Sequence, residues 1–93
     1  LNEAEIRKIV DLQLNSLERR VAELGWDLNV TEDARAAIAD EGYDPQYGAR
    51  PLKRVIQQKC ENPLATEILK IDSPDSGRTI TIDFIDGEYL FRQ

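Results

Sequence analysis

Apolar residues recur at helical spacing through the first quarter of the chain, and steps of four and three keep them on one face. They are Ile6, Ile9, Val10, Leu14, Leu17, Val21 and Leu24. Asn2 can cap this segment, Glu5 completes a capping-box arrangement, and Gly25 suits a left-handed helix end. The pattern predicts one amphipathic helix of about six turns that packs on its own domain, with a coiled coil as the alternative.

A short strand and a second helix follow this segment. Residues 26–30 alternate apolar and polar side chains, as a strand does. Thr31 is then placed to cap a helix that carries Glu32 and Asp33 in its first turn, where carboxylates suit the positive end of the dipole. This helix should end before Gly42.

The third helical segment begins after a stretch rich in turn formers, residues 42–51, with Pro51 as its expected first residue. Its apolar face comprises Leu52, Val55, Ile56, Cys60, Leu64 and Ile68. Because this face stays in register across Asn62-Pro63, we expect a kink or two abutting helices there and no long loop. Cys60 lies on the apolar face and is interpreted as a small core residue.

The last part of the chain is predicted to be β structure. Residues 72–78 are a polar connection, and strands are expected at 79–85 and 88–92, joined at Asp86-Gly87, a dipeptide typical of hairpins. The chain is therefore expected to be one α+β domain over residues 1–93. It should have a long N-terminal helix, further helices and a small β-sheet with a C-terminal hairpin.

Composition excludes several functions. The 93 residues carry a net charge of −6, which disfavours nucleic acid and anionic membranes as partners. No apolar run approaches the roughly 20 residues that span a bilayer, and no secretory signal is visible at the start. Histidine is absent and no phosphate-binding G-x-x-x-x-G-K-[ST] loop occurs. A single cysteine cannot form an internal disulfide and fits a reducing compartment.

The charge is unevenly distributed, and this points to a site. Between residues 45 and 60 there are four cations and no acid, and the other 77 residues carry −10. Arg50, Lys53 and Arg54 lie at the start of the third helix, where cations oppose the helix dipole but favour a phosphate group. The sequence therefore suggests an anion site at Arg50. The alternative is an ion pair of Arg50 with Asp40, Glu41 or Asp44.

Other side chains near this segment receive structural interpretations. Lys53 and Arg54 are expected on a solvated face or in contact with another subunit. Tyr43 and Tyr47 are expected to pack under the turn. Trp26 is interpreted as a core or interface anchor, so it joins the two cations as a candidate interface residue.

The segment G-Y-D-P-Q-Y-G-A-R-P-L-K-R resembles the small (lid) subdomain of Clp-type AAA+ ATPases, whose G-A-R triplet holds the sensor-2 arginine. Three further segments resemble ClpB-type disaggregases in particular: I-V-D-L-Q-L, L-G-W-D-L and I-Q-Q-x-x-E-N-P-L-A. The resemblance covers essentially the whole chain. It identifies the C-terminal small subdomain of the second AAA+ module, separated from the large subdomain that would hold the nucleotide.

The resemblance implies a role for the turn-rich segment. Arg50 would sense bound ATP or ADP, held with magnesium by the large subdomain, and Gly48, Ala49 and Pro51 would form the loop beside the nucleotide. Implied partners are the chain's own large subdomain, neighbouring protomers of a hexameric ring, a chaperone of the seventy-kilodalton class and aggregated polypeptide. Such a chaperone of the stress response would be cytoplasmic, or in the stroma or matrix of an organelle. The isolated chain should not hydrolyse ATP.

Two functions of other classes are the alternatives. One is a free-standing helical protein–protein interaction module that uses the apolar face of the first helix, in which Leu17 would contact the partner. The other is a nucleic-acid binder that uses the four cations, which a net charge of −6 disfavours.

Overall fold

A computed structural model describes residues 2–70 and 79–92 of the chain. The elements are α1 (Glu3–Glu23), β1 (Asp27–Val30), α2 (Glu32–Glu41), α3 (Leu52–Ile56), the π-helical turn η1 (Gln57–Glu61), α4 (Asn62–Lys70), β2 (Thr79–Ile85) and β3 (Glu88–Arg92). The predicted polar connection at 72–78 lies outside the described residues.

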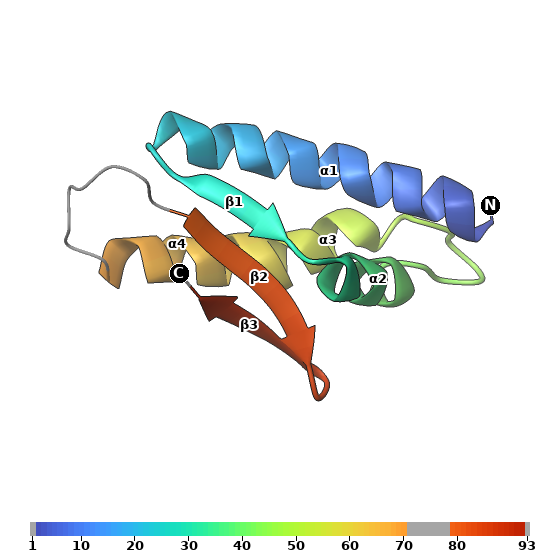
Figure 1. The fold of residues 1–93 in the computed structure, drawn as a ribbon. Coiled ribbons are helices and arrows are strands. Elements are labelled where there is room, and N and C mark those ends of the chain that lie inside the picture. Colours follow the sequence, from blue (N-terminus) through green and yellow to red (C-terminus); the bar gives the residue numbers. More distant parts are fainter. Residues whose placement is uncertain (1, 71–78, 93) are drawn as a thin grey trace.

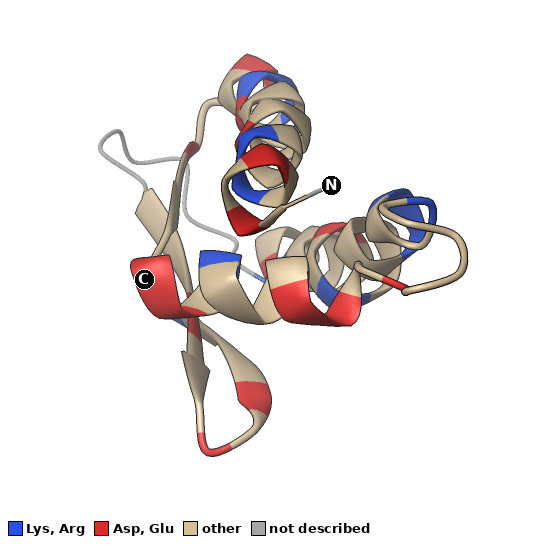
Figure 2. Cartoon of the chain, turned by 90° about the vertical axis from the view of Figure 1, so that its right-hand side faces the viewer, with Lys and Arg blue, Asp and Glu red and all other residues tan. Residues whose placement is uncertain are grey.

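Three layers enclose one core. The sheet forms one side and the continuous run α3–η1–α4 forms the opposite side, while α1 lies along the top of both (Figure 1). Seen from the end of the molecule, α2 crosses beneath α1 and closes the core from below (Figure 2). The predicted α+β class is confirmed.

The sheet has the order β1-β2-β3. β1 pairs with β2 in parallel, from Asp27 opposite Thr79 to Val30 opposite Ile82, and β2 pairs with β3 in antiparallel. Asp86 and Gly87 both have positive φ, 53° and 80°, as a two-residue hairpin turn demands. The hairpin is confirmed at its predicted bounds. The parallel pairing with β1 was not predicted.

α1 is a single helix with its apolar face in the core. The Glu5 N–H donates to Asn2 Oδ1 over 2.9 Å, and Gly25 has a φ of 87° at the other end, so both predicted ends are confirmed. Leu24 is 63% exposed, so its assignment to the apolar face was wrong; it follows the last helical turn and points outward. Leu17 is 2% exposed within the chain's own core, so the face that the interaction-module alternative would use is already buried.

The third helical segment runs without a loop from Leu52 to Lys70 but changes its winding at η1. Pro63 explains the change, because proline lacks an amide hydrogen and its ring collides with the carbonyl four residues back, which belongs to Lys59 in η1. The expectation of an irregularity without a loop is confirmed. Pro51 stands at the N-cap position, so the prediction that it is the first helical residue was wrong by one position; α3 begins at Leu52.

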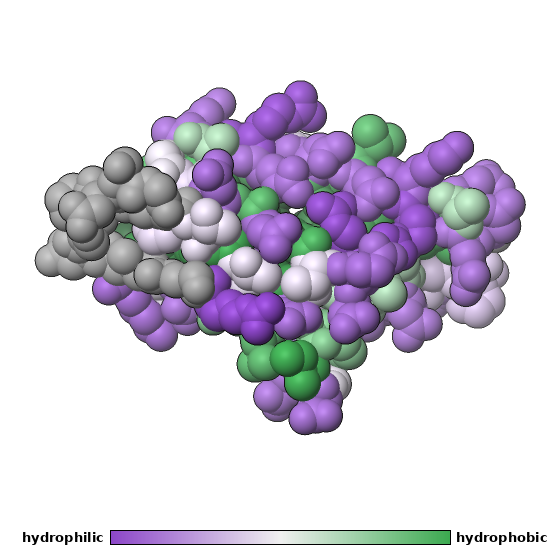
Figure 3. All heavy atoms as spheres, in the orientation of Figure 1, coloured by the Kyte–Doolittle hydropathy of each residue, from purple (hydrophilic) through white to green (hydrophobic). Residues whose placement is uncertain are grey.

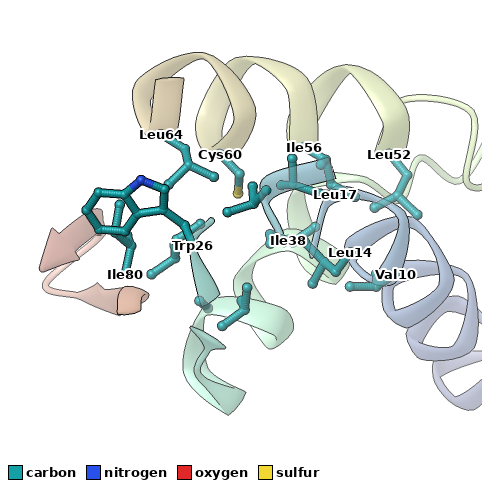
Figure 4. Close-up of a cluster of buried hydrophobic side chains, with 14 of the residues drawn as sticks. Val10, Leu14, Leu17, Trp26, Ile38, Leu52, Ile56, Cys60, Leu64 and Ile80 are labelled. Carbon is teal, nitrogen blue, oxygen red and sulfur yellow. The ribbon is translucent and has the colours of Figure 1, made fainter. Parts of the chain in front are cut away.

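The core gathers side chains from every layer (Figure 4). Trp26 is 3% exposed and lies beside Leu64 and Ile80. Within this chain it is therefore a core residue, which was one of the two predicted roles. Cys60 is fully buried and confirms its interpretation as a core residue. The other buried apolar residues are Ile6, Val10, Leu14, Leu17, Val21, Val30, Ala34, Ile38, Leu52, Ile56 and Ile82.

Two polar clusters tie the layers together. Thr31 Oγ1 accepts the Ala34 N–H at the start of α2 and donates to Asp83 Oδ1 in β2 over 2.9 Å. Arg35, with a side chain only 19% exposed, pairs with Asp11 and Glu18 of α1 over 2.6 and 3.2 Å. Its Nε also donates to the carbonyl of Val30. These contacts set the orientation of α2 against α1 and the sheet.

Asp83 should make stability depend on acid pH. The Phe84 N–H and the Thr31 hydroxyl, with Arg92 at 3.2 Å, lower the pKa of Asp83 below its usual value. A lowered carboxyl pKa contributes stability that is present above the unfolded value of about 3.9 and is lost as pH falls through the folded value. The free energy of unfolding of the wild type, measured in urea, should therefore exceed that of Asp83→Asn at pH 7. The difference should shrink toward pH 3; a constant difference would contradict the assignment.

Cys60 should be inert in the folded chain. Burial raises the pKa of its thiol to about 12, and the thiolate is the reactive form. We expect a maleimide or iodoacetamide reagent at pH 8 to label native protein at the rate of unfolding, and urea-unfolded protein at the rate of a free thiol. Rapid labelling of the native chain would show that η1, which carries Cys60, opens locally.

Candidate functional site

The turn-rich segment of residues 42–51 leaves the core at a close contact between two helices. A Cβ added at Gly42 would lie 2.5 Å from Leu52 Cδ1 and 2.9 Å from Leu52 Cα. Only glycine therefore fits where the end of α2 meets the start of α3. Since Leu52 is fully buried, this contact fixes both ends of the segment and directs its middle outward.

A tight turn from Asp44 to Gly48 forms the tip of the segment. Asp44 and Gly48 exchange two backbone hydrogen bonds of 2.8 and 2.6 Å. Asp44 Oδ1 accepts the N–H groups of Gln46 and Tyr47 over 2.7 and 3.1 Å. Gly48 has a φ of 68°, a conformation that glycine adopts without steric cost. Four hydrogen bonds thus hold this turn, and it presents Tyr47 and Arg50 from a defined backbone.

Arg50 is exposed, and its contact within the described residues is with an aromatic ring. The guanidinium Cζ lies 5.5 Å from the centroid of the Tyr47 ring. Among the residues that the structure describes, no carboxylate forms an ion pair with Arg50. The proposed ion-pair alternative is thereby not supported.

Two of the three acids considered as partners are engaged elsewhere. Asp44 accepts bonds within its own turn. Glu41 accepts the hydroxyl of Tyr89, and burial with this bond raises the pKa of Tyr89. Neither of these two acids therefore pairs with the guanidinium of Arg50, which lies on the outside of the molecule.

The start of α3 offers fewer backbone donors than the sequence suggested. Pro51 has no amide hydrogen, and the Leu52 N–H donates to the carbonyl of Ala49 over 3.1 Å. Positive charge here comes mainly from side chains: Lys53 and Arg54 are both exposed. Figure 2 shows this basic turn of α3 on the side of the molecule away from the sheet.

The two tyrosines of the segment do not pack beneath it. Tyr43 is 39% exposed and Tyr47 is 54% exposed, so the expectation that they fill the space under the turn was wrong. Gly42 contacts Leu52 directly, so no aromatic ring lies between these two residues. The Tyr47 ring instead lies against the guanidinium of Arg50.

A groove that the sequence did not indicate runs beside the basic turn, between α1 and the α3–η1 run. Its volume is about 670 Å³, and it is lined in part by Leu12, Ile56 and Lys53. Arg20 and Glu61 form an ion pair of 2.5 Å at the same groove. Leu12, 68% exposed, faces solvent on α1, outside the helical face that sequence periodicity assigned to the core.

The open face of the sheet is mainly hydrophilic, with an apolar cluster at the hairpin (Figure 3). Ile85 and Leu90 are 44% and 40% exposed on the hairpin strands. Within residues 2–70 and 79–92, no group of three or more histidine, cysteine or acidic residues is placed to hold a metal ion. No helix in those ranges is long and apolar enough to cross a bilayer.

Comparison with known proteins identifies relatives over the whole chain. Residues 1–82 match the family model of the C-terminal, D2-small domain of ClpB protein. Proteins named chaperone protein ClpB are 50% identical over 91 residues in Rhodopirellula baltica, 47% over 92 in Porphyromonas gingivalis and 42% over 87 in Aquifex aeolicus. These alignments cover 98%, 99% and 94% of this chain, but only 10%, 10% and 8% of the relatives. The chain thus spans about a tenth of their length.

Gly42→Ala tests whether the contact with Leu52 organises the segment. The added methyl meets backbone as well as side chain, so we expect a loss of about 1–3 kcal/mol in the free energy of unfolding, measured in urea. Adding Leu52→Ala to this variant should recover little of the lost stability, because the added methyl would still lie 2.9 Å from the Leu52 Cα. Unchanged stability of Gly42→Ala would mean that the helices separate easily at this point.

Proposed function

We propose, from the premise that this chain belongs to the ClpB D2-small domain family, that its Arg50 senses the nucleotide of a ClpB-type chaperone. The chain is the C-terminal small subdomain of such a protein's second AAA+ module. Its nucleotide would be ATP or ADP with magnesium, held by a large subdomain that contributes the phosphate-binding loop. The isolated small subdomain is a regulatory part of that ATPase and is expected to be inactive alone.

The observation that carries the proposal is the exposure of the Arg50 guanidinium and its surroundings. Its guanidinium is exposed and has no carboxylate partner among the described residues, and it stands beside Lys53 and Arg54 in a chain of net charge −6. A planar guanidinium offers parallel N–H donors that match phosphate oxygens. The donor set therefore fits a polyphosphate. Magnesium ligands would have to come from the large subdomain, since the described residues hold no suitable acidic cluster.

A nucleotide shifts a conformational equilibrium only if it binds the two states differently. The γ-phosphate of ATP adds charge and acceptor oxygens that ADP lacks, so Arg50 would draw the small subdomain onto the large one more strongly with ATP. Gly48 permits the tight turn, and the Ala49 carbonyl and Pro51 set the direction of the chain at Arg50. These three residues act through backbone conformation.

For the whole protein we propose an ATP-dependent disaggregase or unfoldase that assembles as a hexameric ring. Lys53 and Arg54 are exposed next to Arg50 and are candidates for contacts with a neighbouring protomer. A chaperone of the seventy-kilodalton class would deliver aggregated polypeptide. The proposed location is the cytoplasm, or the stroma or matrix of an organelle.

Arg50→Ala in the full-length protein that carries this domain should lower ATP turnover or ATP affinity by about tenfold or more, the range for a hydrogen bond to a charged group. ADP affinity should fall less. Arg50→Lys should restore only part of the loss, because an ammonium lacks the planar fork of donors. Melting temperature should stay unchanged, since Arg50 is exposed and makes no ion pair with the described residues.

Arg19→Ala is the matched control. Arg19 is also exposed, has no ion pair among the described residues, and lies on α1 away from the turn. The Arg19→Ala variant should keep ATP turnover and nucleotide affinity at wild-type values. Equal losses in the two variants would point to general electrostatic attraction and contradict a specific contact by Arg50.

A further inference from the structure

We propose that Tyr47 is a positioning residue for Arg50: its ring supports the guanidinium and leaves the N–H donors free for a phosphate group. This inference deepens the proposed function and rests on it. The guanidinium Cζ lies 5.5 Å from the Tyr47 ring centroid, within the range of a cation–π interaction.

The backbone places the two side chains before any ligand arrives. The Tyr47 N–H donates to Asp44 Oδ1 over 3.1 Å, and the Tyr47 carbonyl accepts the Arg50 N–H over 3.3 Å. Both residues are therefore attached to the same hydrogen-bonded turn. A ring held in this way limits the conformations of the long arginine side chain, which would otherwise lose much rotamer freedom on binding.

An aromatic support differs from a carboxylate in what it leaves available. The ring attracts the cation through the negative charge of its face, so it consumes no N–H donor and neutralises no charge. A carboxylate would occupy two donors in parallel hydrogen bonds. Tyr47 thus restrains Arg50 while its full hydrogen-bonding capacity remains for an anion.

Tyr43 makes the role of Tyr47 testable within one segment. Both tyrosines are exposed, at 39% and 54%, yet only Tyr47 among the described residues lies over the guanidinium. The two tyrosines thus share a segment and a partly exposed state, and the arginine contact distinguishes Tyr47. Tyr43→Leu is the matched control for Tyr47→Leu.

The first measurement is independent of nucleotide. In nuclear magnetic resonance spectra of the 93-residue chain, the ring current of Tyr47 should shift the Arg50 side-chain protons upfield. Tyr47→Leu should remove the shift, whereas Tyr47→Phe should retain it because the aromatic face is kept. Tyr43→Leu should have no effect. Arg50 proton shifts that are the same in wild type and Tyr47→Leu would overturn the inference.

The second measurement uses the full-length protein. A cation–π contact at an exposed site corresponds to a change of about two- to fivefold. We expect Tyr47→Leu to weaken ATP binding by this factor, Tyr47→Phe and Tyr43→Leu to leave it unchanged, and ADP binding to change less. In an Arg50→Ala background, Tyr47→Leu should have no additional effect, because the residue it positions is gone.

These experiments distinguish failure of the positioning role of Tyr47 from failure of the sensing role of Arg50. If Arg50→Ala weakens ATP binding but Tyr47→Leu does not, the positioning role is wrong and the sensing role stands. An additive effect of Tyr47→Leu and Arg50→Ala also overturns it, since Tyr47 would then act by another route. If Arg50→Ala itself changes nothing, the proposed function fails and takes this inference with it.

Discussion

The contact between Gly42 and Leu52 is the constraint on which the rest of the site depends. Leu52 is fully buried, and the backbone of Gly42 approaches it so closely that a methyl group would not fit. Both ends of the turn-rich segment are therefore held against the core. Its middle residues therefore project into solvent, and Arg50 is exposed although Leu52, two positions later, is buried.

The projecting segment keeps a defined shape because it satisfies its own hydrogen bonds. Asp44 supplies both backbone groups and a side-chain oxygen to the turn, so it is not available to neutralise Arg50. Glu41 is directed toward Tyr89 on β3. Two of the acids nearest in sequence are thus engaged within the fold and do not pair with the Arg50 guanidinium. Arg50, Lys53 and Arg54 are exposed near one another in sequence on a chain whose net charge is −6.

Local sequence patterns predicted most of the fold and indicated Arg50 as a candidate site residue. They did not predict the features that depend on contacts between residues distant in the sequence. Helix ends and the hairpin follow from short-range chemistry at Asn2, Gly25 and Asp86-Gly87, and these predictions were confirmed. The parallel pairing of Asp27 with Thr79 and the network at Arg35 join distant residues, which periodicity does not encode. The exposure of Tyr43 and Tyr47 was mispredicted because the space beneath the turn depends on how two helices meet. The role of Arg50 remains a proposal.

The parallel pairing of β1 with β2 has a consequence for biosynthesis. β1 leaves the ribosome early, but its partner strand begins only at Thr79, near the other end of this domain. Because a chain emerges from its N-terminal end, α1 and α2 can form and associate while the edge of β1 that later pairs with β2 is still unpaired. The nascent domain therefore passes through a stage in which that edge is open to wrong partners. Emergence of the hairpin, which carries β2, covers that edge and ends this stage.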